Sequence, residues 1–140
     1  MTPVFFDTNI LVYLFDADAP AKRDRAREVF SSEVEAGRFV TSTQVLQEFY
    51  VAVTRKLSVP LAAEEAEEAV TALAELPVTP VDPRLILQGI RRGREMQVSF
   101  WDALIIEAAL AAGAGRLLTE DLQHGREVAG LKIENPFSER

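Results

Sequence analysis

Two spacings of apolar residues alternate along the chain and predict strands that alternate with helices. Short runs of apolar, strand-forming residues at 3–6, 38–41 and 116–119 have the pattern of strands buried on both faces. Two more short strands are expected at 78–81, between prolines, and at 131–133. Apolar residues at helical spacing predict helices over 9–15, 21–36, 62–76, 83–97 and 100–112, and another from a cap at Ser42 or Thr43 to about residue 57.

This alternation predicts an α/β protein with three layers, α/β/α, in which helices cover both faces of a central, mainly parallel sheet of four to five strands. The segment 100–112 is apolar nearly all round, which is typical of a helix buried in the centre of a fold. A chain of 140 residues has the size of one ordinary domain. We therefore expect residues 1–140 to form a single domain.

The residue composition excludes several kinds of catalytic site. The chain has no cysteine and one histidine, which rules out disulfides, thiolate metal sites, cysteine nucleophiles and histidine-rich zinc sites. A Ser-His-Asp hydrolase would depend on His124, which lies in a polar Gln-His-Gly stretch. Carboxylates therefore make up most of the catalytic groups that remain.

Several acidic residues follow the predicted strands or lie near the starts of the predicted helices. They are Asp7, Glu48, Asp102, Glu120 and Asp121. Ligands of an open parallel sheet bind outside the carboxyl ends of its strands. We therefore expect these side chains to face one edge of the sheet.

Each of these acids also has a purely structural explanation. Asp7 is placed to cap the helix that follows it, and Ser99 and Asp102 have the spacing of a capping box. Glu48 falls outside the apolar stripe of its helix, where a glutamate is usually solvated, and the pair that follows the strand at 116–119 suits a polar turn. Their expected convergence is what favours a functional site.

Converging carboxylates without lysine or histidine partners repel one another unless a cation is bound. Oxygen ligands alone select hard cations, so Mg²⁺ or Mn²⁺ is expected instead of zinc or copper. Such ions support phosphodiester hydrolysis because they activate water and stabilise charge on the phosphate, and no protein nucleophile is needed. The acidic residues thus indicate a metal-dependent phosphodiesterase.

Four segments of the sequence resemble the motifs of PIN-domain ribonucleases of the VapC toxin type. FFDTNIL at 5–11 resembles the opening strand with its Asp-Thr-Asn motif, and QEF at 47–49 resembles the helix that bears the family's glutamate. SFWDA at 99–103 and LTED at 118–121 resemble the third and fourth motifs. The four motifs follow the family's order and span nearly the whole chain.

The resemblance implies a PIN-like fold and a site of four acids that are both catalytic residues and ligands of Mg²⁺ or Mn²⁺. These acids are Asp7, Glu48, Asp102 and Asp121. The residues expected to support them from neighbouring positions are Thr8, Asn9, Ser99, Thr119 and Glu120. The choice between Glu120 and Asp121 as the fourth acid stays open at this stage, as does the number of ions.

The resemblance also implies an endoribonuclease that acts on RNA as the toxin of a VapBC-type toxin–antitoxin pair. Such a protein is usually a homodimer, and a small antitoxin covers its acidic groove. One alternative is a phosphoaspartate receiver or phosphatase-like domain with Asp7 as nucleophile, although Asn9 stands where the Asp-x-Asp motif of the phosphatases has its second acid. The other alternative is a PIN-like scaffold that binds RNA or protein without cutting.

The distribution of charge reconciles an RNA substrate with a net charge of −7. Six acids lie in the segment 64–82, which contains no lysine or arginine. Setting these six and the four proposed site acids aside leaves 12 of the 22 acidic residues against 15 basic ones. Basic clusters at 22–27, 55–56 and 84–94 are placed to flank a phosphate backbone, if they are not simply solvated helix faces.

The sequence favours a cytoplasmic protein that does not enter a membrane. Its most apolar region, 100–118, is interrupted by Asp102, Glu107 and Arg116 and is too short for a span. The first residues lack the basic cluster of a signal peptide, and the absence of cysteine suits a reducing compartment.

Overall fold

The computed structural model describes residues 2–138. Strands and helices alternate along this part of the chain as the apolar pattern predicts. In chain order the elements are β1 (Val4–Phe6), α1 (Thr8–Tyr13), α2 (Pro20–Glu35), β2 (Phe39–Ser42), α3 (Thr43–Arg55), α4 (Ala63–Ala74), β3 (Val78–Thr79), α5 (Pro83–Met96), α6 (Phe100–Ala111), β4 (Arg116–Leu118), β5 (Glu127–Val128) and β6 (Leu131–Glu134).

The strands form one sheet in the order β3-β2-β1-β4-β6-β5. β1 lies inside the sheet and pairs in parallel with β2 and β4, so that Phe5 stands opposite Val40 on one side and Leu117 on the other. β3 and β6 extend the parallel arrangement outward, and β5 runs antiparallel to β6 at the edge. The carboxyl ends of β1, β2 and β4 consequently share one edge of the sheet.

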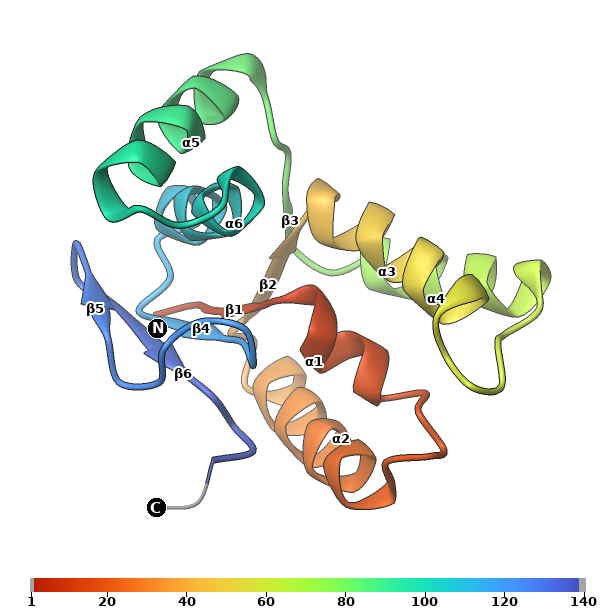
Figure 1. The fold of residues 1–140 in the computed structure, drawn as a ribbon. Coiled ribbons are helices and arrows are strands. Elements are labelled where there is room, and N and C mark those ends of the chain that lie inside the picture. The colour runs from red at the N-terminus through yellow and green to blue at the C-terminus, as the bar shows by residue number, and fades with distance from the viewer. Residues whose placement is uncertain (1, 139–140) are drawn as a thin grey trace.

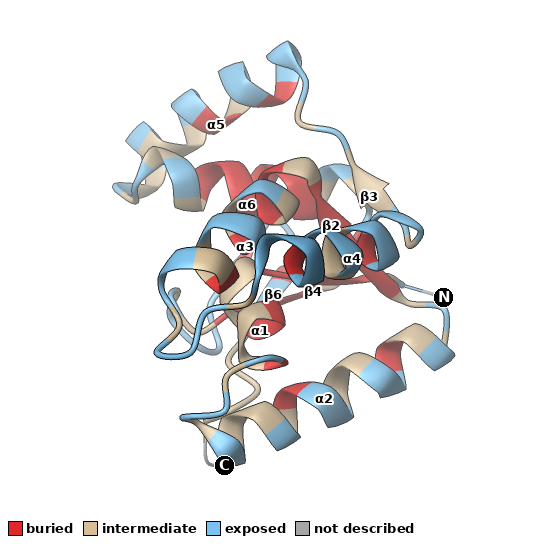
Figure 2. Ribbon diagram, turned by 90° about the vertical axis from the view of Figure 1, so that its right-hand side faces the viewer, coloured by how far each residue is buried: buried red, intermediate tan, exposed pale blue. Residues whose placement is uncertain are grey.

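Helices cover both faces of this sheet (Figure 1). α6 packs against β2 and β4, and α5 lies over α6, whereas α2 packs against β2. Figure 2 shows the sheet between α6 and α2, with α5 outermost. The expected three-layer α/β/α architecture with a mainly parallel sheet is confirmed. No helix within residues 2–138 is long and apolar enough to cross a membrane.

The core forms where apolar strand residues meet the two helical layers. Phe6 of β1 packs against Phe39 of β2 and Phe30 of α2, with ring centroids 4.9 and 6.1 Å apart. Most of α6 is buried, as its apolar sequence predicts. Gly89 lets α5 approach α6 closely, because a Cβ atom there would lie 3.1 Å from Cδ1 of Leu104. The first turn of α6 is thereby held at the edge where the strands end.

The sheet has six strands, and the expectation of four to five was wrong because residues 127–128 form an additional strand. Ala129 and Gly130 join β5 to β6 in a two-residue turn, with φ angles of 51° and 88°. Turns of this kind usually carry Asn-Gly or Asp-Gly, and alanine in a left-handed conformation gives little signal in a sequence. The expected helix at 9–15 is also shorter and spans Thr8–Tyr13.

Candidate active site

Asp7 and Thr119 follow the neighbouring strands β1 and β4 and form the floor of the candidate site. The backbone N–H of Asp7 continues the pairing of these strands by donating to the carbonyl of Leu118 at 3.0 Å. Oδ1 of Asp7 accepts a hydrogen bond from the backbone N–H of Thr8 at 2.7 Å, and Oδ2 accepts one from the hydroxyl of Thr119 at 2.8 Å. Asp7 therefore caps α1, as its position predicts, and lies at the strand-end edge as well.

The carboxyl group of Asp7 lies in an environment that penalises its charge. Only 5% of the residue is exposed, and this burial is the main reason why its pKa rises from 3.8 to about 7. The hydrogen bonds from Thr119 and Thr8 lower the pKa, whereas the nearby carboxylates of Asp121 and Glu48 raise it further. Without a cation, Asp7 therefore keeps its proton to a much higher pH than an exposed aspartate does.

Glu48 extends from α3 toward the starts of two other helices. Its Oε1 accepts a hydrogen bond from the hydroxyl of Thr8 at 2.7 Å, and its Oε2 accepts one from Nε2 of Gln44 at 3.1 Å. Gln44 also donates to the carbonyl of Trp101 at 3.4 Å, which ties α3 to α6. Glu48 is therefore held in place by hydrogen bonds and is not the freely solvated glutamate that the sequence left open as an alternative.

Gln44 is a residue of this site that the sequence analysis missed. It is 5% exposed, and its Oε1 is buried without a hydrogen-bond partner among the described residues. Its position four residues before Glu48 places the two side chains on one face of α3. That spacing was the available signal, but it does not distinguish a functional pair from an ordinary surface pair.

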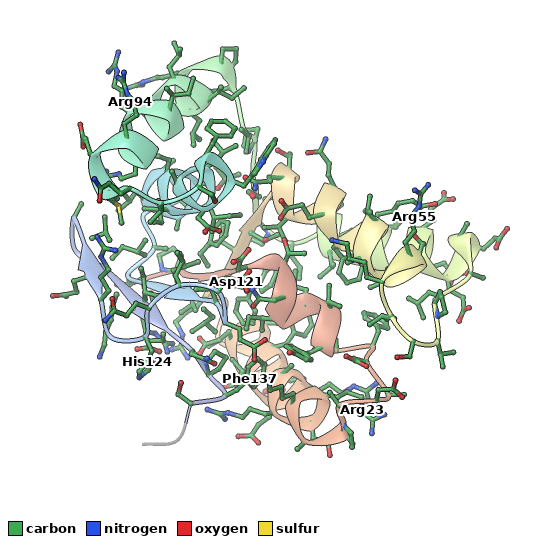
Figure 3. All side chains as sticks on the ribbon, viewed as in Figure 1. Arg23, Arg55, Arg94, Asp121, His124 and Phe137 are labelled. Atoms are coloured by element: carbon green, nitrogen blue, oxygen red, sulfur yellow. The ribbon has the colours of Figure 1, made fainter. Side chains whose placement is uncertain are left out.

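The loop after β4 directs its two acids to different places. Nδ2 of Asn9 donates to Oδ2 of Asp121 at 3.0 Å, and the backbone N–H of Asp121 donates to the hydroxyl of Thr119 at 3.1 Å. Glu120 instead accepts a hydrogen bond from Tyr13 and pairs with Lys22. Figure 3 shows Asp121 near the centre of the molecule, beside the start of α1. Asp121 is thus the acid of this loop that joins the other carboxylates.

Asp102 approaches the same place from the first turn of α6. The hydroxyl of Ser99 accepts a hydrogen bond from its backbone N–H at 3.1 Å, which makes Ser99 the helix cap. Burial is the main cause that raises the pKa of Asp102; the Ser99 side chain lowers it, and the charges of Asp121 and Glu48 raise it further. Since Asp121 and Glu48 act on both Asp7 and Asp102, the structure brings the four predicted acids into one electrostatic cluster.

The four acids present oxygen atoms that no basic side chain of the described residues neutralises in an ion pair. None of the ion pairs found within residues 2–138 involves any of them. Their side chains do not converge on one point: across the described residues, no three acidic or histidine side chains are grouped tightly enough to hold an ion. Mutual repulsion opposes such convergence without a cation. The chemistry of the donors, all of them oxygen, fits Mg²⁺ or Mn²⁺.

A groove of about 670 Å³ leads away from the acids. Thr8, Asn9, Glu48 and Asp121 line one part of it, and Lys56, just after α3, lines another. A second cavity, of about 760 Å³, lies between α2 and the strands β4 and β6 and is lined by none of the four acids. Of the two cavities, the groove is therefore the one that borders the acid cluster, through Glu48 and Asp121.

The sequence of residues 4–130 matches the family described as the PIN domain. The chain belongs to the PIN domain family. This match confirms the resemblance carried by the four motifs, and it covers all four predicted acids. No curated protein matches the sequence.

Solved structures with the same fold include proteins of toxin–antitoxin pairs. A toxin–antitoxin complex from Klebsiella pneumoniae has a TM-score of 0.69 and 19% sequence identity, over 96% of this chain and 98% of that chain. DNA-bound VapBC from Salmonella typhimurium has a TM-score of 0.69 and 21% identity, over 97% and 99%. VapC20 from Mycobacterium tuberculosis, a toxin that cleaves the sarcin-ricin loop, has a TM-score of 0.62 and 22% identity, over 81% and 86%. At these identities the comparisons establish a shared fold.

The basic clusters of this PIN domain take different positions around the acids. Lys22 pairs with Glu120, and Lys56 lines the groove. Arg23, Arg55 and Arg94 lie at the outside of the molecule (Figure 3). From the sequence, all these clusters were equally placed to flank a phosphate backbone, because a run of basic residues does not show which side chain turns toward the site.

Proposed function

We propose that this PIN domain is a metal-dependent endoribonuclease that hydrolyses RNA phosphodiester bonds with Mg²⁺ or Mn²⁺, as the toxin of a VapBC-type pair. One observation carries the proposal. Besides burial, which is the larger cause, Glu48 and Asp121 raise the pKa of both Asp7 and Asp102. The four carboxylates, which form no ion pair within residues 2–138, thus lie near enough to repel one another, and a divalent cation bound among them would relieve that repulsion. The likeness to VapC20, which cleaves the sarcin-ricin loop, supports RNA as the substrate.

The four acids would hold the ion, and the residues hydrogen-bonded to them orient their oxygen atoms. A bound Mg²⁺ or Mn²⁺ supplies a Lewis acid that favours ionisation of the attacking water and stabilises negative charge on the phosphate. The hydroxyl of Thr119 orients Asp7, Thr8 orients Glu48, and Asn9 orients Asp121. Such supporting contacts reduce the rearrangement that the carboxylates undergo when an ion binds.

The groove beside the acids is the proposed path of the RNA. Lys56 offers a positive charge to a phosphate away from the bond that is cut, while Val12 and Val51 form an apolar part of the groove wall. We also propose that a small antitoxin covers this groove and that the protein acts in the cytoplasm as a homodimer. The likeness to the VapBC complex and to the Klebsiella toxin–antitoxin complex supports the antitoxin partner. The exposed Ile86, Leu87 and Ile90 of α5 offer an apolar surface for a second copy.

The geometry disfavours the phosphoaspartate alternative. A nucleophilic aspartate must present a free oxygen to the incoming phosphorus atom. Asp7 is 5% exposed, and each of its oxygens accepts a hydrogen bond. Asp7 is therefore better placed to be a fixed ligand than a nucleophile.

Incubation of the full chain with total cellular RNA and Mn²⁺, followed by mapping of the cut ends, tests the proposal. We expect cleavage by the wild type and a loss of at least about 100-fold in Asp7→Asn and Asp102→Asn, with the fold intact by circular dichroism. The matched control is Asp18→Asn, which removes an exposed acid outside the cluster. Cleavage that persists in both site variants, or in excess chelator, contradicts the proposal. RNA binding without cutting by the wild type would instead identify a scaffold.

A further inference from the structure

Glu120, the acid next to Asp121, binds two side chains that hydrogen-bond to none of the four acids of the cluster in the described part of the chain. Its Oε1 accepts a hydrogen bond from the hydroxyl of Tyr13 at 2.7 Å, and its Oε2 forms an ion pair with Lys22. The ammonium group of Lys22 also donates to the hydroxyl of Tyr13 at 3.3 Å. About a quarter of the Glu120 side chain is exposed (25%). The carboxylate of Glu120 is thus engaged by a hydroxyl and by an ammonium group, neither of which belongs to the four acids.

Lys22 is itself held by aromatic rings. Its ammonium group lies 5.1 Å from the ring centroid of Tyr13 and 5.5 Å from that of Phe137, within the range of cation–π attraction. The two rings meet edge to face with their centroids 5.0 Å apart. Figure 3 shows Phe137 beside α2, the helix that carries Lys22. The chain after β6 thereby helps to keep Lys22 directed at Glu120.

The backbone of Glu120 is fixed by the same helix that fixes its side chain. Oδ1 of Asn9 accepts a hydrogen bond from the backbone N–H of Glu120 at 3.1 Å, while Nδ2 of Asn9 donates to Asp121. Asn9 and Tyr13 are four residues apart on α1, so they lie on one face of that helix. One face of α1 therefore holds the Glu120 backbone, the Glu120 side chain and the Asp121 carboxylate at the same time.

We propose that Tyr13 and Lys22 are positioning residues of the metal site, which keep Glu120 out of it and thereby direct Asp121 into it. The inference rests on the proposed function, because it assigns these residues a role in metal binding. Two adjacent acids in one loop both attract a cation, and a competing partner for one of them favours the arrangement in which the other faces the site. Tyr13 and Lys22 provide that partner, and within residues 2–138 neither side chain forms a hydrogen bond or ion pair with any of the four acids.

Calorimetric titration of the full chain with Mn²⁺ alone, without RNA, tests this role. We expect Lys22→Met and Tyr13→Phe to weaken Mn²⁺ binding by about 10-fold each, the usual effect of losing a contact that orients a ligand. Lys22→Arg keeps the positive charge, so this variant is expected to bind Mn²⁺ with an affinity within about threefold of that of the wild type. Lys132→Met is the control, because Lys132 is exposed and its ion-pair partner, Glu134, lies 3.9 Å away and outside the cluster.

The direction in which the Mn²⁺ affinity changes separates a positioning role from a purely electrostatic one. Removing a positive charge near a cation site strengthens cation binding if charge alone acts, so tighter or unchanged Mn²⁺ binding in Lys22→Met and Tyr13→Phe overturns the inference. Unchanged Mn²⁺ affinity with a raised KM for RNA in Lys22→Met also overturns it, because Lys22 is then a substrate contact. Should Lys22→Met not fold, Tyr13→Phe, which loses one hydroxyl, decides the matter. If the wild type binds no Mn²⁺, the proposed function itself fails.

Discussion

Replacing Asp7 by asparagine is expected to stabilise the metal-free protein at neutral pH. Burial raises the pKa of Asp7 from 3.8 to about 7, so the folded state binds a proton that the unfolded chain has already released. The stability of the wild type therefore falls as pH rises from about 4 to about 7, and it changes little beyond. Asparagine stays neutral throughout and avoids this loss.

The size of the effect follows from the pKa and from the contacts of the side chain. A rise of roughly three units corresponds to at most about 4 kcal/mol of unfolding free energy at pH above 7. The new amide would face the hydroxyl of Thr119, which already accepts hydrogen bonds from Asn9 and from the backbone of Asp121. Crowding three donors on one hydroxyl costs about 1–2 kcal/mol. We therefore expect a net gain of about 2–3 kcal/mol at pH 7.5 and a loss of about 1 kcal/mol at pH 4.

Urea unfolding in excess chelator at the two pH values measures this difference. Asp18→Asn serves as the control, because an exposed acid is expected to leave the unfolding free energy within about 0.5 kcal/mol of the wild type. The raised pKa of Asp102 acts in the wild type and in the variant alike, so it cancels in the comparison. A variant that is no more stable than the wild type at pH 7.5, or that gains equally at pH 4, refutes the reasoning.

Two further predictions concern the metal and the packing of α5. Mn²⁺ at a hundred times its Kd is expected to add about 2.7 kcal/mol to the unfolding free energy of the wild type at pH 7.5. The same concentration of Mn²⁺ should add much less at pH 4, because the raised pKa of Asp7 leaves that side chain protonated there. Thermal unfolding with and without Mn²⁺ checks this, and equal shifts at both pH values would contradict it. Gly89→Leu should cost about 1–3 kcal/mol, because even a Cβ atom there lies 3.1 Å from Leu104. Urea unfolding of this variant beside Gln88→Leu, on the neighbouring half-exposed position, measures that cost, and equal stabilities would show that α5 is not closely packed.

The parts of the site that the sequence predicted correctly are those set by local rules. Asp7 and Ser99 lie at positions where a strand ends or a helix begins, and both act as helix caps in the structure. The parallel order of the strands then brings their carboxyl ends to one edge of the sheet, so the placement of the acids along that edge followed from the fold class. The family motifs located the same positions independently.

The remaining parts depend on contacts between elements that are far apart in the chain. Tyr13 and Lys22 contact Glu120 although they lie 107 and 98 residues before it in the sequence, and no pattern in the sequence predicts these contacts. The family motif pointed to Asp121 as the fourth acid and left Glu120 open as the alternative, because the contacts that separate the two acids join distant parts of the chain. β5 was missed because Ala129 adopts a left-handed conformation without the usual residue type.

The long spans bridged by the site also determine when it can exist during synthesis of the chain. Thr8 meets Glu48 across 40 residues, but Asn9 meets Asp121 across 112. A nascent chain that has emerged only as far as β3 carries two of the four carboxylates and leaves one edge of β1 unpaired, since β4 takes that place in the finished sheet. The cluster of four acids can therefore be complete only late in translation, when β4 pairs with β1 and the loop after it brings in Asp121. A fragment that stops before residue 121 lacks one of the four acids and the contact that Asn9 makes with it.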